Sequence, residues 1–130
     1  MADILLIDDM NGVRRAIKAV LTRAGHKVTD VDDGSVALDI LRAGQRFDLV
    51  ITDVLMPKKD GSEVVLYLDS QATRPKVLAI SGGGSQVSAS EALMLAKNKA
   101  DASLAKPFDN AELLKVVDEL LAPAAAGAHR

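Results

Sequence analysis

Two adjacent aspartates, Asp8 and Asp9, directly follow an apolar run that begins at Ile4. A third aspartate, Asp53, follows another apolar run. A buried carboxylate is costly unless it is paired with a positive group or bound to a metal ion. Taken alone, the adjacent pair is most simply a solvated acidic turn. The alternative is that the three carboxylates meet in the folded chain and hold a cation.

Two further polar residues stand at comparable positions. Ser81 comes directly after the apolar segment Val77–Ile80, and Lys106 follows the short segment Ser103–Ala105. A serine hydroxyl can donate a hydrogen bond to an anionic oxygen, and a lysine ammonium is a compact positive charge. Each residue also has an ordinary interpretation, since Ser81 could cap a helix and Lys106 could be a surface lysine.

The elements that must position these residues are short aliphatic strands. Apolar runs without polar alternation are typical of strands that are buried on both faces of a sheet. Such runs occur at residues 4–7, 49–51 and 77–80, and weaker strand patterns occur at residues 27–31 and 103–105. The sequence therefore predicts five strands, four of which lead directly into the polar residues described above.

Helical apolar spacing separates the predicted strands. The apolar positions of the predicted helices lie within residues 13–21, 36–41, 64–68, 89–96 and 113–121. The segment 64–68 is ambiguous by period and is assigned as helix because parallel strands need a crossover there. Asp109 is the predicted N-cap of the last helix, and Pro123 is its predicted stop. The alternation predicts an α/β fold with a parallel sheet and helices on both faces, whose ligands gather beyond the carboxyl ends of the strands.

Composition excludes several classes of protein. The 130 residues carry a net charge of −2, which provides no broad basic field for DNA. Only three of them are aromatic, which is too few for a surface that stacks bases. No cysteine is present, and no apolar run reaches the ~18 residues needed to cross a bilayer. We expect one cytoplasmic domain over residues 1–122, followed by a disordered Ala-rich tail over residues 123–130.

Four stretches, LLIDDM, DLVITDVLMPKKDG, VLAISG and SLAKPF, together resemble the receiver domains of two-component response regulators. The resemblance covers residues 3–122 and is specific because all four motifs occur in register. It implies a doubly wound, flavodoxin-like (βα)₅ fold with the strand order 2-1-3-4-5.

The resemblance also implies roles for the acidic residues. Asp53 would accept a phosphoryl group in a Mg²⁺-dependent reaction. Asp9 and Asp53 would bind Mg²⁺ directly, together with the backbone carbonyl of Leu55, and Asp8 would hold a metal-bound water. Oxygen ligands of this kind are those that Mg²⁺ prefers.

The remaining motif residues are expected to sense the phosphoryl group. By resemblance to the family, Lys106 would contact oxygens of the phosphoryl group, and the peptide bond between Lys106 and Pro107 would be cis. Ser81 would form a switch hydrogen bond once the loop at Gly82 moves inward. Ser103 stands where many receivers carry a Tyr or Phe, so the usual aromatic half of the switch is missing.

The leading hypothesis is a stand-alone receiver that is not an enzyme in its own right. It would take its phosphoryl group from a sensor histidine kinase or a histidine phosphotransfer protein. Its output would be recognition by a downstream protein or onward phosphorelay, without nucleic acid or membrane partners. Two alternatives remain open: a pseudo-receiver that is never phosphorylated, and an aspartyl-phosphate phosphohydrolase.

Overall fold

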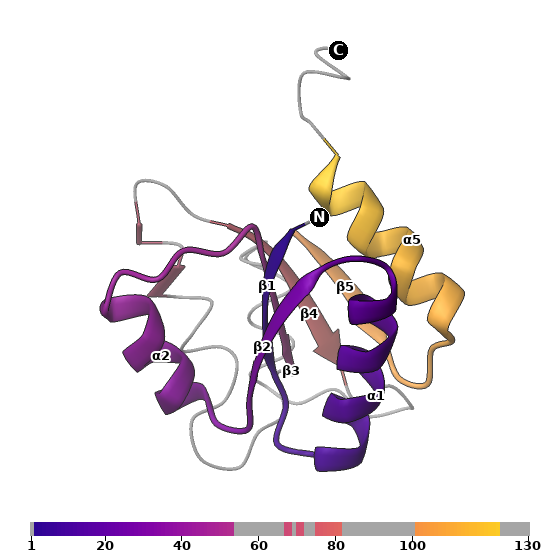
Figure 1. The fold of residues 1–130 in the computed structure, drawn as a ribbon, viewed down its shortest axis with the longest axis horizontal. Helices are drawn as coiled ribbons and strands as arrows, with labels where there is room; N and C mark the ends of the chain where they lie inside the picture. Colours follow the sequence, from indigo (N-terminus) through magenta and orange to yellow (C-terminus); the bar gives the residue numbers. More distant parts are fainter. Residues whose placement is uncertain (1, 54–66, 69, 72–74, 82–100, 123–130) are drawn as a thin grey trace.

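The computed structural model describes residues 2–53, 67–68, 70–71, 75–81 and 101–122. A five-stranded parallel sheet in the order β2-β1-β3-β4-β5 forms its centre (Figure 1). The strands are β1 Asp3–Ile7, β2 Lys27–Val31, β3 Leu49–Asp53, β4 Lys76–Ser81 and β5 Ala102–Ala105. The predicted strands and their order are confirmed.

Three helices of the described chain cover the sheet. They are α1 Asn11–Arg23, α2 Gly34–Arg42 and α5 Asn110–Leu121. The predicted helix around residues 89–96 lies outside the described residues, and of residues 64–68 only Tyr67 and Leu68 are described, both helical. The predicted tail, residues 123–130, also lies outside them. None of the helices in the described ranges combines the length and hydropathy that a bilayer span requires.

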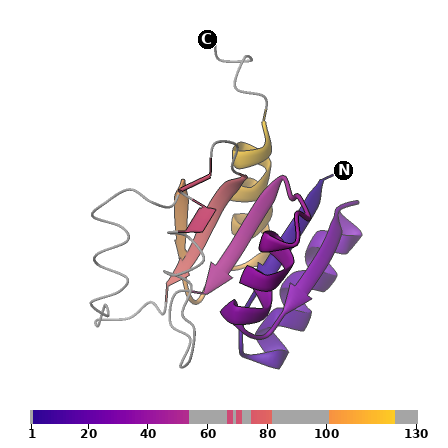
Figure 2. The same cartoon turned by 90° about the vertical axis from the view of Figure 1, so that its left-hand side faces the viewer.

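The core consists of two apolar layers, one on each face of the sheet. The helices α1 and α5 pack on one face and α2 packs on the other (Figures 1 and 2). Side chains alternate between the faces along each strand, as β geometry requires. In β3, Val50 points into the α2 layer, whereas Leu49 and Ile51 point into the α1/α5 layer. Every residue of β3 is buried, which explains why its sequence shows no polar alternation.

Asp48 joins the amino ends of three strands. Its backbone N–H donates to the carbonyl of Asp3, its carbonyl accepts from Lys76, and its carboxylate accepts from the Asp3 N–H at 2.9 Å. These bonds satisfy backbone groups at the edge where β1, β3 and β4 begin. The side chain and backbone of Asp48 therefore link the strands at the edge opposite the predicted site.

The predicted N-cap of the last helix is confirmed. The Asp109 carboxylate accepts from the Glu112 N–H at 2.8 Å, and the Glu112 carboxylate accepts from the Asp109 N–H at 3.3 Å. This reciprocal pair is a capping box, which satisfies two amide groups that the helix leaves free.

Asp109→Ala is expected to lower the free energy of unfolding by about 1 kcal/mol, because the cap acceptor is lost. Urea denaturation followed by circular dichroism measures this change. Glu119→Ala, an exposed substitution on the same helix, serves as the control and should change stability by much less. Equal effects of the two substitutions would contradict a specific capping role.

Candidate functional site

The register of the sheet brings the acidic residues together. Ile7 is the last residue of β1 and pairs with Thr52 of the neighbouring strand β3. Asp8 directly follows β1, and Asp53 is the last residue of β3. Because the strands are parallel, both carboxylates lie at the same edge of the sheet.

The register of the other two strands adds the remaining motif residues to this edge. Ser81 is the last residue of β4 and pairs with Ala105 of β5, and Lys106 follows Ala105. Asp53 pairs with Ile80, so Ser81 lies one residue and Lys106 two residues beyond the level of Asp53 at the carboxyl ends of the strands.

The three carboxylates form a compact acidic group. One oxygen each from Asp8, Asp9 and Asp53 lies within 4.8 Å of the other two. Asp8 is 0% exposed and Asp53 is 3% exposed. At this separation and an effective dielectric constant of ~20, two carboxylates repel each other by roughly 3 kcal/mol. A cation at this point would relieve the repulsion.

Lys106 supplies part of the missing positive charge. Its Nζ lies 3.0 Å from Asp53 Oδ2 and 3.8 Å from Asp8 Oδ2. The ammonium therefore forms a close ion pair with Asp53, the candidate phosphoryl acceptor. Its distance to Asp8 is near the upper limit for an ion pair. Of the residues assigned from the sequence, it is the one that brings positive charge to the acidic group.

The environment of Asp8 is unusual for a carboxylate. Its Oδ1 accepts a hydrogen bond from the Met10 N–H at 2.9 Å, but among the described residues its buried Oδ2 accepts none. Burial raises the pKa of Asp8, and the Met10 N–H and the Lys106 charge only partly oppose that effect. A buried oxygen without a donor, beside two other carboxylates, is suited to a hard cation or to its bound water.

The other predicted site residues are described to different extents. The Lys106–Pro107 peptide bond is cis, as expected. Ser103 is exposed on β5, and Ser81 is described by its backbone position at the end of β4. Leu55 and Gly82 lie outside the described residues, so their predicted roles stay predictions.

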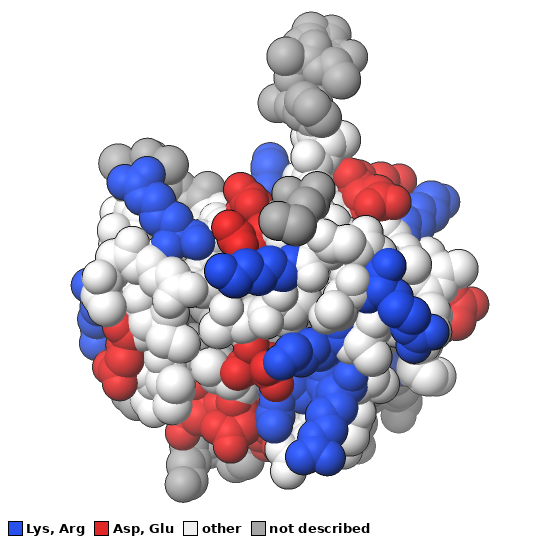
Figure 3. Space-filling model, viewed as in Figure 1, with Lys and Arg blue, Asp and Glu red and all other residues white. Residues whose placement is uncertain are grey.

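A charged network beside the acidic group was missed by the sequence reasoning. Arg14 Nε and Lys18 Nζ, both on α1, lie 3.0 Å and 2.9 Å from the two carboxylate oxygens of Asp30 on β2. Figure 3 shows basic side chains gathered over α1 beside acidic ones near the end of β2. The available signal was the spacing of Arg14 and Lys18, because like charges four residues apart on a helix repel unless an acid lies between them.

The network lowers the pKa of Asp30, chiefly through the hydrogen bond from Lys18 and also through that from Arg14. Asp30→Asn is therefore expected to cost about 1 kcal/mol of unfolding free energy at pH 7. A carboxyl group with a lowered pKa stabilises the fold above its unfolded pKa and loses this effect as the pH falls through the folded pKa. The difference between wild type and variant should accordingly shrink as the pH falls below 3.8 and vanish only once the pH is below the folded pKa, which is lower than 3.8.

Urea denaturation across this pH range measures that difference. Asp39→Asn, an exposed substitution on α2, is the matched control and should show no comparable dependence. A wild-type advantage that persists unchanged at acid pH would show that the ion pairs do not stabilise the fold.

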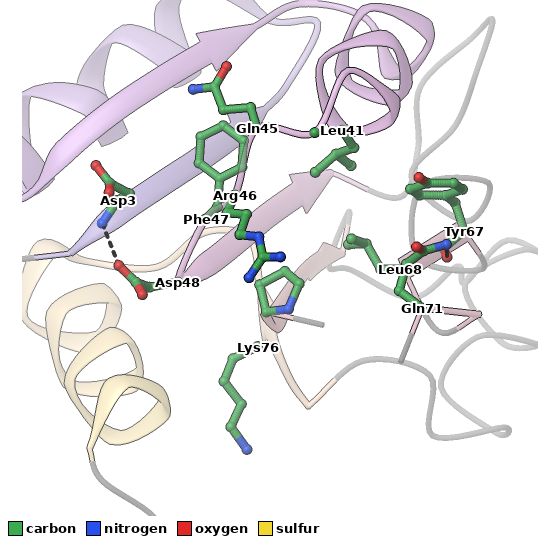
Figure 4. A pocket seen from close by; sticks show the side chains of 12 residues that line it. Asp3, Leu41, Gln45, Arg46, Phe47, Asp48, Tyr67, Leu68, Gln71 and Lys76 are labelled. Carbon is green, nitrogen blue, oxygen red and sulfur yellow. Dashed lines mark hydrogen bonds between the residues drawn. The ribbon is translucent and has the colours of Figure 1, made fainter. Parts of the chain in front are cut away.

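A pocket of about 700 Å³ lies at the opposite edge of the sheet, where β1, β3 and β4 begin (Figure 4). Arg46 and Lys76 line it together with Asp3 and Asp48, and the last two are hydrogen-bonded to each other. Because Asp3 begins β1 and Asp48 directly precedes β3, the pocket lies at the ends of these strands opposite Asp8 and Asp53 and takes no part in the acidic site.

Comparison with known proteins agrees with the geometry. The family described as "Response regulator receiver domain" matches residues 4–118. The response regulator MprA of Mycolicibacterium vanbaalenii is 36% identical over 118 residues, which cover 91% of this chain and 49% of that protein. The transcriptional regulatory protein CpxR of Escherichia coli is 34% identical over 121 residues, which cover 93% of this chain and 50% of that protein.

The solved structures include a similar fold in the chemotaxis response regulator CheY4 of Vibrio cholerae. It superimposes with a TM-score of 0.76 at 30% identity, covering 93% of this chain and 99% of that one. The match covers 99% of the solved CheY4 chain, whereas this chain spans about half the length of the curated relatives MprA and CpxR.

Proposed function

This chain belongs to the response regulator receiver domain family, and on that basis we propose that Asp53 accepts a phosphoryl group from a phosphohistidine. The donor would be a sensor histidine kinase or a histidine phosphotransfer protein. The observation that carries the proposal is the convergence of three carboxylates and the Lys106 ammonium at one edge of the sheet. A solvated acidic turn would not bury two of its carboxylates.

The proposed reaction is a nucleophilic substitution at phosphorus. One carboxylate oxygen of Asp53 forms the new O–P bond while the N–P bond of the phosphohistidine breaks, and the imidazole nitrogen keeps the electron pair. The transferred group spreads negative charge over its three other oxygens, so positioning and charge neutralisation supply most of the catalysis. Lys106 is held 3.0 Å from Asp53 and can move its contact to one of these oxygens.

The proposed cofactor is Mg²⁺. Asp9 and Asp53 would bind it directly with the carbonyl of Leu55, and Asp8 would bind one of its waters. The fully buried Asp8 Oδ2, which accepts no hydrogen bond in the described ranges, supports this assignment. When bound, the ion neutralises the carboxylates and offers open positions to phosphoryl oxygens.

We assign the switch to Ser81 and the loop at Gly82, with Lys106 as a second contact to the phosphoryl group. One hydrogen bond to a charged oxygen is worth ~1.5–3 kcal/mol, whereas a nearly complete shift between two states needs ~5.5 kcal/mol. Ser81 therefore needs the Lys106 contact and repacking below the loop to complete the change. The output would be a changed protein-binding surface or onward phosphotransfer by a stand-alone domain.

Labelling with phosphoramidate, a small phosphodonor, tests the proposal. With Mg²⁺ we expect about one phosphoryl group per chain, stable in acid and labile in base, and little without Mg²⁺. Rapid multiple turnover would instead favour a phosphohydrolase. Absence of any label would favour a pseudo-receiver that acts only by binding.

A further inference from the structure

The short connection between β1 and α1 carries two of the three clustered carboxylates. Asp8 donates its N–H to the carbonyl of Val31 at 3.1 Å, and its carboxylate accepts from the Met10 N–H. Its carbonyl accepts from Arg14 Nη1 at 3.0 Å. Both backbone groups of Asp8 are therefore fixed, one by β2 and the other by a side chain of α1.

Arg14 links this connection to Asp30 on β2. While Nη1 donates to the Asp8 carbonyl, Nε donates to Asp30 Oδ2 at 3.0 Å. The Arg14 side chain is only 13% exposed, and Lys18 holds the other oxygen of Asp30. A guanidinium is planar and presents its donors in fixed directions, so the bond to Asp30 sets the direction in which Nη1 points.

The Asp8 carbonyl belongs to the peptide group that leads into Asp9. Fixing that peptide plane fixes the N–Cα bond of Asp9 and so restricts the positions that its side chain can reach. One of its carboxylate oxygens lies within 4.8 Å of those of Asp8 and Asp53, so the group is compact enough to hold a single ion. The contact made by Arg14 thus acts on the geometry of the acidic group without touching any of its carboxylates.

We propose that Arg14 is a positioning residue for the metal site, through its bridge between Asp30 and the Asp8 carbonyl. The proposal rests on the proposed Mg²⁺-dependent function and deepens it. Residues that orient metal ligands typically contribute 10- to 100-fold to metal affinity, so a measurable effect is expected.

Electrostatics and positioning predict opposite changes in Mg²⁺ affinity when Arg14 is removed. Removing a positive charge near a metal site would strengthen Mg²⁺ binding by electrostatics alone. Loss of positioning would weaken it. Lys18 offers a matched control, because it lies one turn further along α1 and binds the same Asp30, yet within the described chain it donates to no group of residues 8–10.

The experiment compares Mg²⁺ dissociation constants by calorimetry for the full chain. Arg14→Met, which keeps the aliphatic part of the side chain, should raise the constant about tenfold, and Lys18→Met should change it by less than about twofold. Arg14→Lys should also raise it, because one ammonium cannot reproduce the two directed bonds. An Arg14→Met constant equal to or below that of wild type would overturn the proposal.

A second variant and a second measurement guard against a folding defect. Asp30→Asn keeps Arg14 but removes its anchor, and should raise the Mg²⁺ constant by about threefold, part of the full effect. In the metal-free protein, the NMR amide signals of Asp9 and Met10 should shift in Arg14→Met but not in Lys18→Met. Unchanged binding in Asp30→Asn together with unmoved signals would also overturn the proposal.

Mg²⁺ binding and phosphorylation of the wild type distinguish a failure of this inference from a failure of the proposed function. If the wild type binds no Mg²⁺, the proposed function fails and the role of Arg14 fails with it. If the wild type binds Mg²⁺ and is phosphorylated while Arg14→Met behaves identically, only the role of Arg14 is refuted.

Discussion

Asp53→Asn is expected to reduce phosphoryl uptake by at least about 10³-fold. The amide has nearly the shape of the carboxylate, so the buried end of β3 can keep its packing. It lacks the anionic oxygen that would attack phosphorus. It also removes the charge that holds Lys106 Nζ at 3.0 Å, so the site loses its nucleophile and this ion pair together.

Phosphoramidate labelling of the two purified chains, resolved by mass spectrometry, measures the effect. Asp39→Asn, on the exposed side of α2, is the control for the substitution itself and should label fully. Circular dichroism establishes that both variants are folded. Full labelling of Asp53→Asn would mean that another residue is the acceptor.

Asp8→Asn is expected to have opposite effects on stability and on metal binding. Asp8 is fully buried near two other carboxylates, so its charge opposes folding in the metal-free protein. The amide can still accept from the Met10 N–H and can donate toward the neighbouring carboxylates. We expect the metal-free variant to be about 1–2 kcal/mol more stable at pH 7 and to bind Mg²⁺ at least about tenfold more weakly.

The pH dependence of this gain has a defined sign. Burial raises the pKa of Asp8, so the cost of its charge to stability accumulates as the pH rises from the unfolded value of 3.8 to the folded pKa and is complete above that pKa. Below the unfolded value of 3.8 the wild-type carboxyl group is protonated in both states, and the two chains should become equally stable. Urea denaturation in the presence of a chelator, from acid to neutral pH, measures the stability difference between wild type and Asp8→Asn. Asp39→Asn again serves as the control for removing a charge at the surface. A variant less stable than wild type at pH 7 would contradict the account of Asp8.

Much of the fold could be predicted because the apolar runs are unambiguous. Residues Ile4–Ile7 and Leu49–Ile51 are fully buried in neighbouring strands, and their lack of alternation signals burial on both faces. Once the strands are known to be parallel, Asp8 and Asp53 must share an edge. The acidic site follows from topology and from the position of each aspartate after its strand.

The support around the site could not be predicted in the same way. The bridge from Asp30 through Arg14 to the Asp8 carbonyl depends on the rotation of α1 about its axis and on the side-chain rotamers. Neither quantity is fixed by periodicity. Asp48 is a similar case, because its sequence position after Phe47 gives no sign that its carboxylate accepts from Asp3.

The two-layered core means that distance along the chain is a poor guide to energetic dependence. Leu49 and Val50 are covalent neighbours, yet they belong to separate packing compartments. Val50 shares its compartment with Leu38 of α2, twelve positions earlier in the sequence. Mutations that share a compartment interact, whereas those without shared partners add independently. Evolution could therefore remodel the α2 side for a new partner without retuning the side that α1 and α5 cover.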